Sequence, residues 1–129
     1  MIVVDASVVV EALVDGGPSG QRARQHLRRH LIAPSHLQLE VISAIRRHLS
    51  AHLLTSEAAA AAVAGLLDAS IELKSIEQHI PRIWQLRHSI SIYDAAYVVL
   101  AEATNSVLLT GDKRLAQAAA GICDVELVD

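Results

Sequence analysis

Residues 106–119 read SVLLTGDKRLAQAA, and this stretch decides the fold class. The apolar run Val107–Leu109 predicts a buried strand, Thr110-Gly111-Asp112 a turn, and Lys113–Ala120 a short helix that Gly121 ends. The same alternation of strand and helix runs through the rest of the chain. Such an alternation is typical of an α/β sandwich with a mainly parallel sheet, in which ligands bind at the carboxyl ends of the strands.

Hydrophobic periodicity and turn residues predict the remaining strands and helices on both sides of that stretch. Further strands are predicted at 2–4, 31–33, 70–73 and 122–127, the last at a sheet edge. Further helices are predicted at 8–14, 21–30, 36–52, 55–67, 77–88 and 94–103. Ser7 and Ser35 are expected to cap the first and third of these helices. No internal repeat or linker is visible, so residues 1–129 are expected to form a single domain.

The composition favours a self-associating α/β protein. Apolar residues make up 52% of the chain, and the only aromatics are Trp84, Tyr93 and Tyr97, so the core must consist of aliphatic side chains. Surplus apolar surface and the alanine-rich stretch Ala58–Leu67 suggest self-association, although a tightly packed core helix explains that stretch as well. The single Cys123 excludes an internal disulfide. No signal peptide and no membrane-spanning stretch are recognised, and a cytoplasmic protein is expected.

The net charge of −3 does not by itself indicate nucleic-acid binding. The distribution of basic residues is more informative, because nine of the eleven are arginine, the better bidentate ligand for phosphate. Solvated helix faces would explain the same pattern. The arginines gather in two clusters, one of Arg22, Arg24, Arg28 and Arg29 and one of Arg46 and Arg47.

Four acidic residues stand at structural boundaries or within apolar patterns. Asp5 follows the first strand, Asp112 follows a later one, and Asp94 opens the helix that ends near Ala103. Each of these three could be an ordinary helix cap. Glu40 is different, because it lies inside an apolar helical pattern, where a carboxylate is costly to bury. One shared site explains all four acids more simply than three caps and one misplaced glutamate.

Glu40 shares a helix face with Ser43 and Arg47, at i+3 and i+7. This spacing fits an intrahelical charge pair between Glu40 and Arg47. It also fits a metal ligand beside a residue that binds phosphate. Both interpretations remain open from the residues alone.

A group of carboxylates needs a cation to stay ionised, and oxygen-only ligands suit Mg²⁺ or Mn²⁺. Zinc is the competing metal, because His26 and His30, and also His48 and His52, have i,i+4 spacing. No third zinc ligand accompanies either pair. The four acids therefore predict metal-assisted phosphate chemistry.

Four blocks of the sequence resemble the PIN-domain ribonuclease family, and in particular its VapC-type toxins from bacterial toxin–antitoxin pairs. Met1–Val8 is similar to the family's strand–Asp–x–Ser opening, and Glu40 stands where its helical glutamate belongs. Ile92–Ala101 resembles its Tyr-Asp-Ala-x-Tyr block, and Thr110–Leu115 its Thr-x-Asp-x-x-Leu block. The resemblance covers nearly the whole chain, and the last two blocks are its specific part.

The resemblance implies a PIN-like three-layer sandwich with a central parallel five-stranded sheet flanked by helices. It implies endonucleolytic cleavage of RNA in a pocket that holds Mg²⁺ or Mn²⁺, as well as a homodimer and a VapB-like antitoxin in a toxin–antitoxin hetero-oligomer. Carried over by position, Asp5, Glu40, Asp94 and Asp112 are the catalytic, metal-binding acids. Family members with a further acid after the last block differ from this chain, in which Lys113 and Arg114 follow Asp112, so the number of metal ions is left open.

Four further residues are expected beside the acids. Ser7 and Thr110 are expected to support the carboxylates or to face the substrate with their hydroxyl groups. Arg47 and Lys113 are candidates for contacts to RNA phosphates, and solvent exposure is the alternative for both.

Two other functions compete with a nuclease. A receiver-like domain that accepts a phosphoryl group on aspartate also clusters acids at strand ends, but Lys74, and not aspartate, follows the strand that should carry the acceptor. A catalytically inactive PIN-like binding module is the other alternative, and the presence of all four acids argues against it.

Overall fold

The computed structural model describes residues 1–128, and its centre is a sheet of five parallel strands in the order β3-β2-β1-β4-β5. The strands are β1 (Ile2–Val4), β2 (Leu31–Pro34), β3 (Ile71–Lys74), β4 (Val107–Thr110) and β5 (Val125–Leu127). Ile2 of the central strand β1 aligns with Leu31 of β2 on one side and with Val107 of β4 on the other. The predicted fold class is confirmed, and β5 lies at an edge as predicted.

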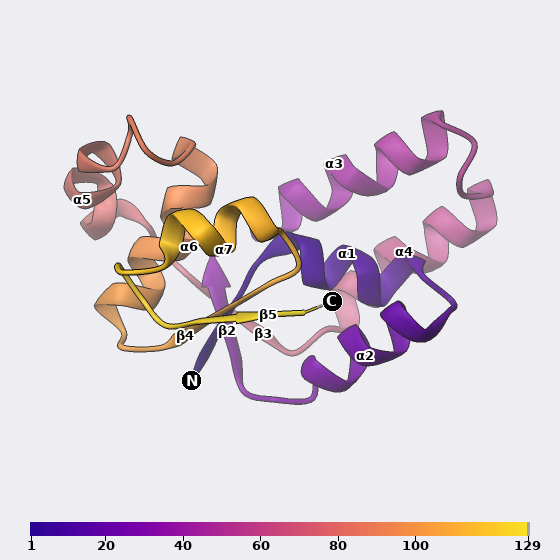
Figure 1. Cartoon of the computed structure of the whole chain (residues 1–129). Helices are drawn as coiled ribbons and strands as arrows, with labels where there is room; N and C mark the ends of the chain where they lie inside the picture. The colour runs from indigo at the N-terminus through magenta and orange to yellow at the C-terminus, as the bar shows by residue number, and fades with distance from the viewer. Residues whose placement is uncertain (129) are drawn as a thin grey trace.

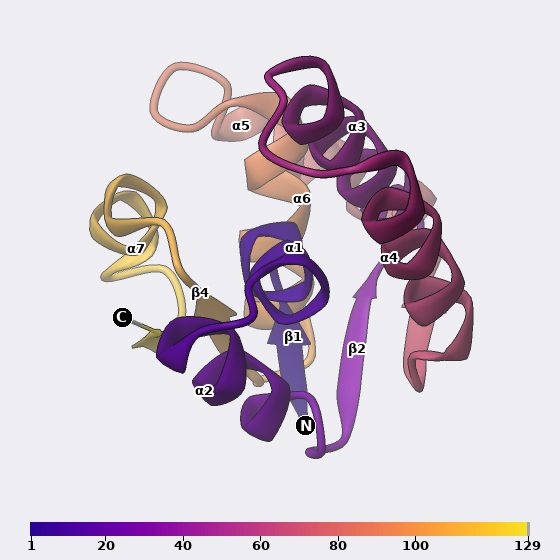
Figure 2. The ribbon, with the colours of Figure 1, turned by 90° about the vertical axis from the view of Figure 1, so that its right-hand side faces the viewer.

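Seven α-helices and one 3-10 helix connect these strands in residues 1–128. They are α1 (Ala6–Val14), α2 (Pro18–His26), α3 (Leu37–Ser50), α4 (Ser56–Asp68), η1 (Glu77–His79), α5 (Ile80–Gln85), α6 (Ile92–Ala103) and α7 (Lys113–Ala119). The chain moves outward from β1 to β3 and then crosses back to β4 and β5. Because crossovers between parallel strands are right-handed, α1–α4 and α5–α7 cover opposite faces of the sheet (Figure 1; Figure 2).

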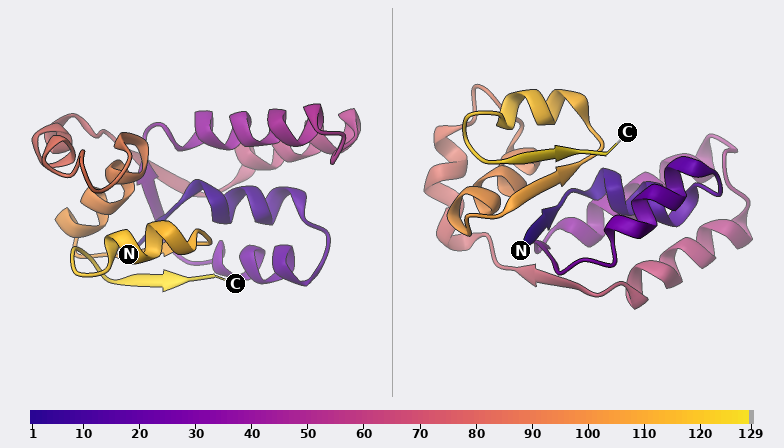
Figure 3. Two further views of the ribbon diagram at one scale, coloured as in Figure 1. Left: turned by 45° about the horizontal axis from the view of Figure 1, so that its top comes forward. Right: turned by 60° about the horizontal axis from the view of Figure 1, so that its bottom comes forward.

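The contacts between elements agree with this division into three layers. Helix α1 packs against α2, α3 and α4, while α6 packs against β1, β2 and β4, and α7 against β4 and β5. Helices α3 and α4 lie side by side and project from one end of the molecule (Figure 3). Ala59, Ala62 and Leu66 of the alanine-rich helix α4 are buried, so one face of this helix belongs to the core.

Several helix boundaries differ from the predicted ones. Helix α1 begins at Ala6, so Ser7 lies inside it and does not cap it, and His36, not Ser35, occupies the N-cap position of α3. Helix α2 begins at Pro18 because proline is well suited to the first turn, where its missing N–H is not needed. The predicted helix 77–88 is broken into η1 and the short α5.

The core is aliphatic, as the composition predicted. All three residues of β1 are buried, and the largest fully buried side chain is that of Tyr97 on α6. In the described part of the chain, no helix is both long and apolar enough to cross a bilayer.

Candidate active site

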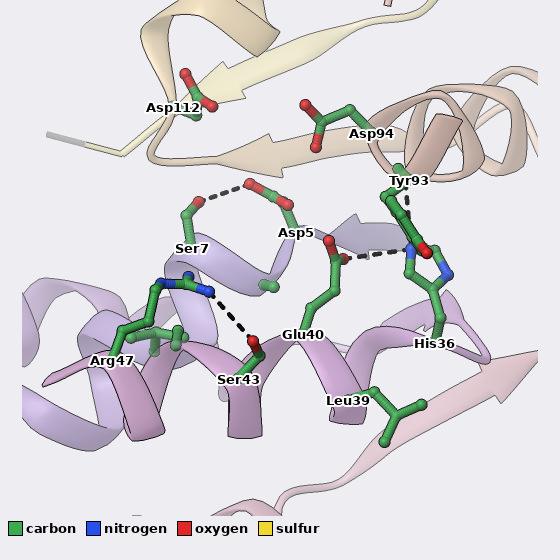
Figure 4. A pocket seen from close by; sticks show the side chains of 13 residues that line it. Asp5, Ser7, His36, Leu39, Glu40, Ser43, Arg47, Tyr93, Asp94 and Asp112 are labelled. Atoms are coloured by element: carbon green, nitrogen blue, oxygen red, sulfur yellow. Dashed lines mark hydrogen bonds and ion pairs between the residues drawn. The ribbon is translucent and has the colours of Figure 1, made fainter. Parts of the chain in front are cut away.

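A cavity of about 700 Å³ lies beyond the carboxyl ends of β1 and β4. These neighbouring strands are the point where the chain reverses its direction across the sheet, and the crossovers on either side leave on opposite faces. Such a position is the usual ligand site of an open α/β sheet. Asp5, Glu40, Asp94 and Asp112 all line the cavity, although Asp5 and Asp112 are separated by more than a hundred residues in sequence. Figure 4 shows the four carboxylates pointing toward a common space.

Asp5 sits directly after β1 and is the most buried of the four acids, with 6% of its surface exposed. Its Oδ2 accepts hydrogen bonds from the hydroxyl groups of Ser7, at 2.6 Å, and Thr110, at 2.8 Å. Asp5 occupies the N-cap position of α1, yet its side chain makes no capping hydrogen bond. The carboxylate is therefore held toward the cavity and not toward the helix.

Ser7 and Thr110 each hold a second segment as well. The hydroxyl of Ser7 accepts the backbone N–H of Gly111 at 3.0 Å, and that of Thr110 accepts the N–H of Asp112 at 3.0 Å. The two hydroxyl groups therefore connect the end of β1 to the turn after β4. Both residues were predicted to stand beside the acids, and this is where the structure places them.

Glu40 projects from α3 and is half-buried. Its Oε1 accepts a hydrogen bond of 2.5 Å from the hydroxyl of Tyr97 and lies 3.3 Å from Nε2 of His36. Arg47, the predicted partner of Glu40 in an intrahelical charge pair, instead donates a hydrogen bond to Ser43 at 3.2 Å. It makes no ion pair with Glu40. The simple intrahelical charge pair is therefore not formed.

Asp94 and Asp112 complete the acidic wall from opposite sides. Ser91, and not Asp94, caps α6, since its side chain accepts the backbone N–H of Asp94 at 3.3 Å. Asp112 does cap α7, because its Oδ1 accepts the N–H groups of Arg114 and Leu115. Of the three aspartates that could have been caps, only Asp112 is one.

The pKa values of the acids divide into two groups. Burial raises the pKa of Asp5 and of Asp94, and the negative charge of Glu40 raises both further. Burial would also raise the pKa of Glu40, but hydrogen bonds from His36 and Tyr97, together with Coulombic attraction to His36 and Arg47, outweigh this effect and lower the pKa. Burial and the adjacent Glu40 carboxylate raise the pKa of Tyr97, so its hydroxyl stays a donor. The site thus concentrates negative charge, and a bound cation would reduce the repulsion between its carboxylates.

The donors fit a hard divalent cation, because every acid facing the cavity offers oxygen. Among residues 1–128, however, no three His, Cys, Asp or Glu side chains lie close enough together to hold a metal as they stand. The four carboxylates therefore line one cavity without forming a closed ligand cluster. The zinc alternative also gains no third ligand in this part of the chain.

The two predicted phosphate contacts lie in different places. Arg47 is exposed and lines the acidic cavity beside Ser43. Lys113 is also exposed, but it lines a neighbouring hollow of about 290 Å³ together with Ser7 and Gly111.

His36 and Tyr97 were missed as members of the site by sequence reasoning. His36 precedes Glu40 by four residues at the start of α3, and Tyr97 follows Asp94 by three residues on α6. These spacings place each residue on the same helix face as an acid and could have identified it. Their convergence on one oxygen could not be read from sequence, since Tyr97 and Glu40 are 57 residues apart.

The sequence is similar to PIN-domain proteins and to VapC ribonucleases. The family model described as PIN domain matches residues 2–121. Ribonuclease VapC1 of Mycobacterium tuberculosis is 40% identical, and the match covers 98% of this chain and 96% of the relative. Ribonuclease VapC12 of the same organism is 35% identical, and 99% of each chain is covered.

Solved structures share the fold at lower sequence identity. The crystal structure of Mycobacterium tuberculosis VapC20, described as a sarcin-ricin loop cleaving toxin, matches with a TM-score of 0.71 at 19% identity, covering 98% of this chain and 99% of that one. PAE2754 from Pyrobaculum aerophilum matches with a TM-score of 0.62 at 22% identity, covering 95% and 87%.

Proposed function

Because this chain belongs to the PIN domain family, and relatives of nearly its own length are VapC ribonucleases, we propose that it is the endoribonuclease toxin of a VapBC-type pair. It would hydrolyse phosphodiester bonds of RNA with the aid of Mg²⁺ or Mn²⁺, and residues 1–129 would form one PIN domain. The observation that carries the proposal is the convergence of Asp5, Glu40, Asp94 and Asp112 in one cavity at the reversal point of the sheet.

The carboxylates of Asp5, Asp94 and Asp112 would hold the metal, and Glu40 would complete its surroundings directly or through water. A divalent metal at such a site lowers the pKa of bound water and neutralises charge on phosphate oxygens. Burial is the main cause of the raised pKa values of Asp5 and Asp94, and neighbouring carboxylates raise both further, so a bound cation would favour the ionised form of each.

The remaining side chains would orient the carboxylates and the RNA. Ser7 and Thr110 hold Oδ2 of Asp5, which leaves Oδ1 to face the cavity. Oε2 of Glu40 would accept a proton from the attacking water, since the lowered pKa keeps this carboxylate ionised. Arg47 would bind a phosphate beside the scissile one, and Lys113, in the adjoining hollow, would contact the RNA further along the strand.

Direct attack by water on phosphorus, in line with the leaving 3′-oxygen, would leave a 5′-phosphate on one product and a 3′-hydroxyl on the other. Attack by the 2′-hydroxyl of the RNA would instead leave a cyclic phosphate. The chemical nature of the ends therefore distinguishes the proposed mechanism from one without a water nucleophile.

We propose a VapB-like antitoxin and a second copy of the chain as partners, joined in a toxin–antitoxin hetero-oligomer. The names of the relatives support the antitoxin. Large apolar side chains that remain exposed, such as Ile80, Trp84 and Ile92, support association in general. The antitoxin would restrain the nuclease by covering the acidic cavity.

The test is to induce the chain without antitoxin in a bacterial host, beside the variant Asp94→Asn, and to map new RNA 5′ ends across the transcriptome. We expect growth arrest and new 5′-phosphate ends only with the unaltered chain. The same ends with both proteins would show that Asp94 is not catalytic. No new ends, although both proteins accumulate in folded form and the unaltered chain binds metal, would favour the inactive binding module.

A further inference from the structure

Glu40 is held by two residues that the proposed chemistry does not use. The hydroxyl of Tyr97 and Nε2 of His36 both approach Oε1, at 2.5 and 3.3 Å. In the described part of the chain, no protein group donates a hydrogen bond to Oε2 of Glu40. The two oxygens of this carboxylate are therefore unequal: one is anchored within the protein, and the other is left for the cavity.

His36 contacts a second acceptor with the same nitrogen. Nε2 lies 3.2 Å from the backbone carbonyl oxygen of Tyr93. A carbonyl and a carboxylate can only accept, so Nε2 must carry the hydrogen that both share. The ring is fixed between two aromatic neighbours, with centroid distances of 5.7 Å to Tyr93 and 5.1 Å to Tyr97.

The contact of His36 with the carbonyl of Tyr93 and the hydrogen bond from Tyr97 to Glu40 both join the start of α3 to the first turns of α6, the helix that carries Asp94. Tyr93 directly precedes Asp94, and Tyr97 lies one helical turn after it. Figure 4 shows His36 standing between Glu40 and Tyr93 at the edge of the cavity. His36 and Tyr97 therefore fix the position of Glu40 relative to Asp94, two acids that come from different helices.

We propose that His36 and Tyr97 are positioning residues, which hold Oε1 of Glu40 against α6 so that Oε2 faces the metal and the RNA. This inference rests on the proposed nuclease function and adds to it the groups that set the geometry of its glutamate. A glutamate on a helix has three rotatable side-chain bonds, and a displacement of about 1 Å in an active site can cost 10²-fold in rate. Two fixed donors on one oxygen remove most of that freedom before substrate binds.

The first test compares His36→Leu, which has no donor, with His36→Gln, whose side-chain N–H can reach the same acceptors, and with Tyr97→Phe. Mn²⁺ affinity, kcat, KM for RNA and the unfolding temperature are measured for each. We expect His36→Leu and Tyr97→Phe to lose about 10- to 100-fold in Mn²⁺ affinity and in kcat, with KM little changed, as for other residues that orient ligands. His36→Gln should recover most of the loss.

A merely structural role predicts a different pattern. The unfolding temperature would then fall, while Mn²⁺ affinity and kcat per folded molecule stayed as in the unaltered chain. That result, or a His36→Gln variant as impaired as His36→Leu, would overturn the proposal.

The second test needs neither metal nor cleavage. Long-range ¹H–¹⁵N spectra of the chain with labelled histidine, recorded in EDTA at neutral pH, report which ring nitrogen of His36 carries hydrogen. The proposal expects hydrogen on Nε2, and a neutral ring protonated only on Nδ1 would overturn it. If the chain cuts no RNA but His36 gives the expected spectrum and its variants bind Mn²⁺ less tightly, the nuclease assignment fails and the positioning role stands.

Discussion

Asp5 stands where a helix cap would stand, but its carboxylate belongs to the acidic cavity. Its position before α1 is that of a helix cap, but its carboxylate binds the hydroxyls of Ser7 and Thr110. Burial raises its pKa, with smaller contributions from the charges of Asp94 and Glu40. The fold therefore gives up some stability at this residue to keep a buried carboxylate beside other acids.

The first prediction concerns Asp5→Asn in the metal-free protein. Because the pKa of Asp5 is higher in the folded state than the unfolded value of about 3.8, the folded chain binds more protons between these two values. The contribution of Asp5 to stability is therefore fully present below the unfolded pKa and is lost as the pH rises through the folded pKa. Asp5→Asn removes this loss, so at pH 7 in EDTA its unfolding temperature should be a few degrees higher, since about 1 kcal/mol corresponds to roughly 4 °C.

The advantage of Asp5→Asn should shrink as the pH is lowered toward 4, and added Mn²⁺ should stabilise the unaltered chain but not the variant. Exposed Asp124 serves as the control, and Asp124→Asn should leave the unfolding temperature nearly unchanged. An Asp5→Asn variant less stable than the unaltered chain at pH 7 without metal would contradict the account.

Thr110 provides a second prediction, because its fully buried hydroxyl binds Asp5 and accepts the N–H of Asp112. Thr110→Val keeps the shape but removes both hydrogen bonds, which should cost about 1–3 kcal/mol of stability and about 10-fold in activity. Thr104→Val is the matched control, since Thr104 bonds the carbonyl of Leu100 away from the cavity. Thermal unfolding and RNA cleavage should show that the control loses stability only; equal losses of activity in both variants would argue against a role of Thr110 in the site.

In helix α7, one residue is both the N-cap and an acid of the site. Asp112 satisfies two backbone N–H groups at the start of α7 and also faces the cavity. Asp112→Asn keeps a capping oxygen, so its stability should change little. Because it loses the carboxylate charge, its activity should fall at least about 10²-fold. Asp112→Ala should lose both activity and about 1 kcal/mol of stability, as measured by cleavage assays and denaturant unfolding. Full activity in Asp112→Asn would show that this residue only caps the helix.

Helix α3 offers a matched pair of arginines for the RNA contact. Arg47 lines the acidic cavity, whereas its neighbour Arg46 is exposed and does not. Arg47→Ala should raise KM about fivefold, which corresponds to about 1 kcal/mol, and should reduce the salt dependence of RNA binding by about one counterion. Arg46→Ala should change neither as much. Equal effects of the two variants would mean that both arginines act only through general charge.

Elements with strong local patterns were predicted well from sequence. The strands β1, β2 and β4 and the helices α6 and α7 follow from apolar runs and capping residues, and their order determines where Asp5 and Asp112 meet. Residues whose function depends on distant partners were not predicted. Apart from their spacing to an acid, nothing in the sequence around His36 or Tyr97 distinguishes them from other helix residues. The interruption of the predicted helix over residues 77–88 depends on tertiary packing, which cannot be predicted from the local sequence.

The exposed apolar surface of the protein predicts self-association. Trp84 and Tyr93 keep more than half of their surfaces exposed and line one hollow together, and a grouped apolar surface of this kind indicates an interaction site. Light scattering at dilute concentration should give twice the 13.8 kDa mass of the chain. A clean monomer at concentrations well above micromolar would contradict the homodimer and leave the nuclease assignment untouched.

Cleavage of RNA by the purified chain, with the chemistry of the product ends determined, tests directly whether the acidic cavity is a metal-dependent hydrolytic site. Mg²⁺ or Mn²⁺ should be required, EDTA should abolish cleavage, and the products should carry 5′-phosphate and 3′-hydroxyl ends. Asp94→Asn, folded and equally stable or more so, should be at least about 10²-fold slower. Cleavage that persists in EDTA, or that leaves cyclic phosphate ends, would contradict the account that the four carboxylates form a metal-dependent hydrolytic site.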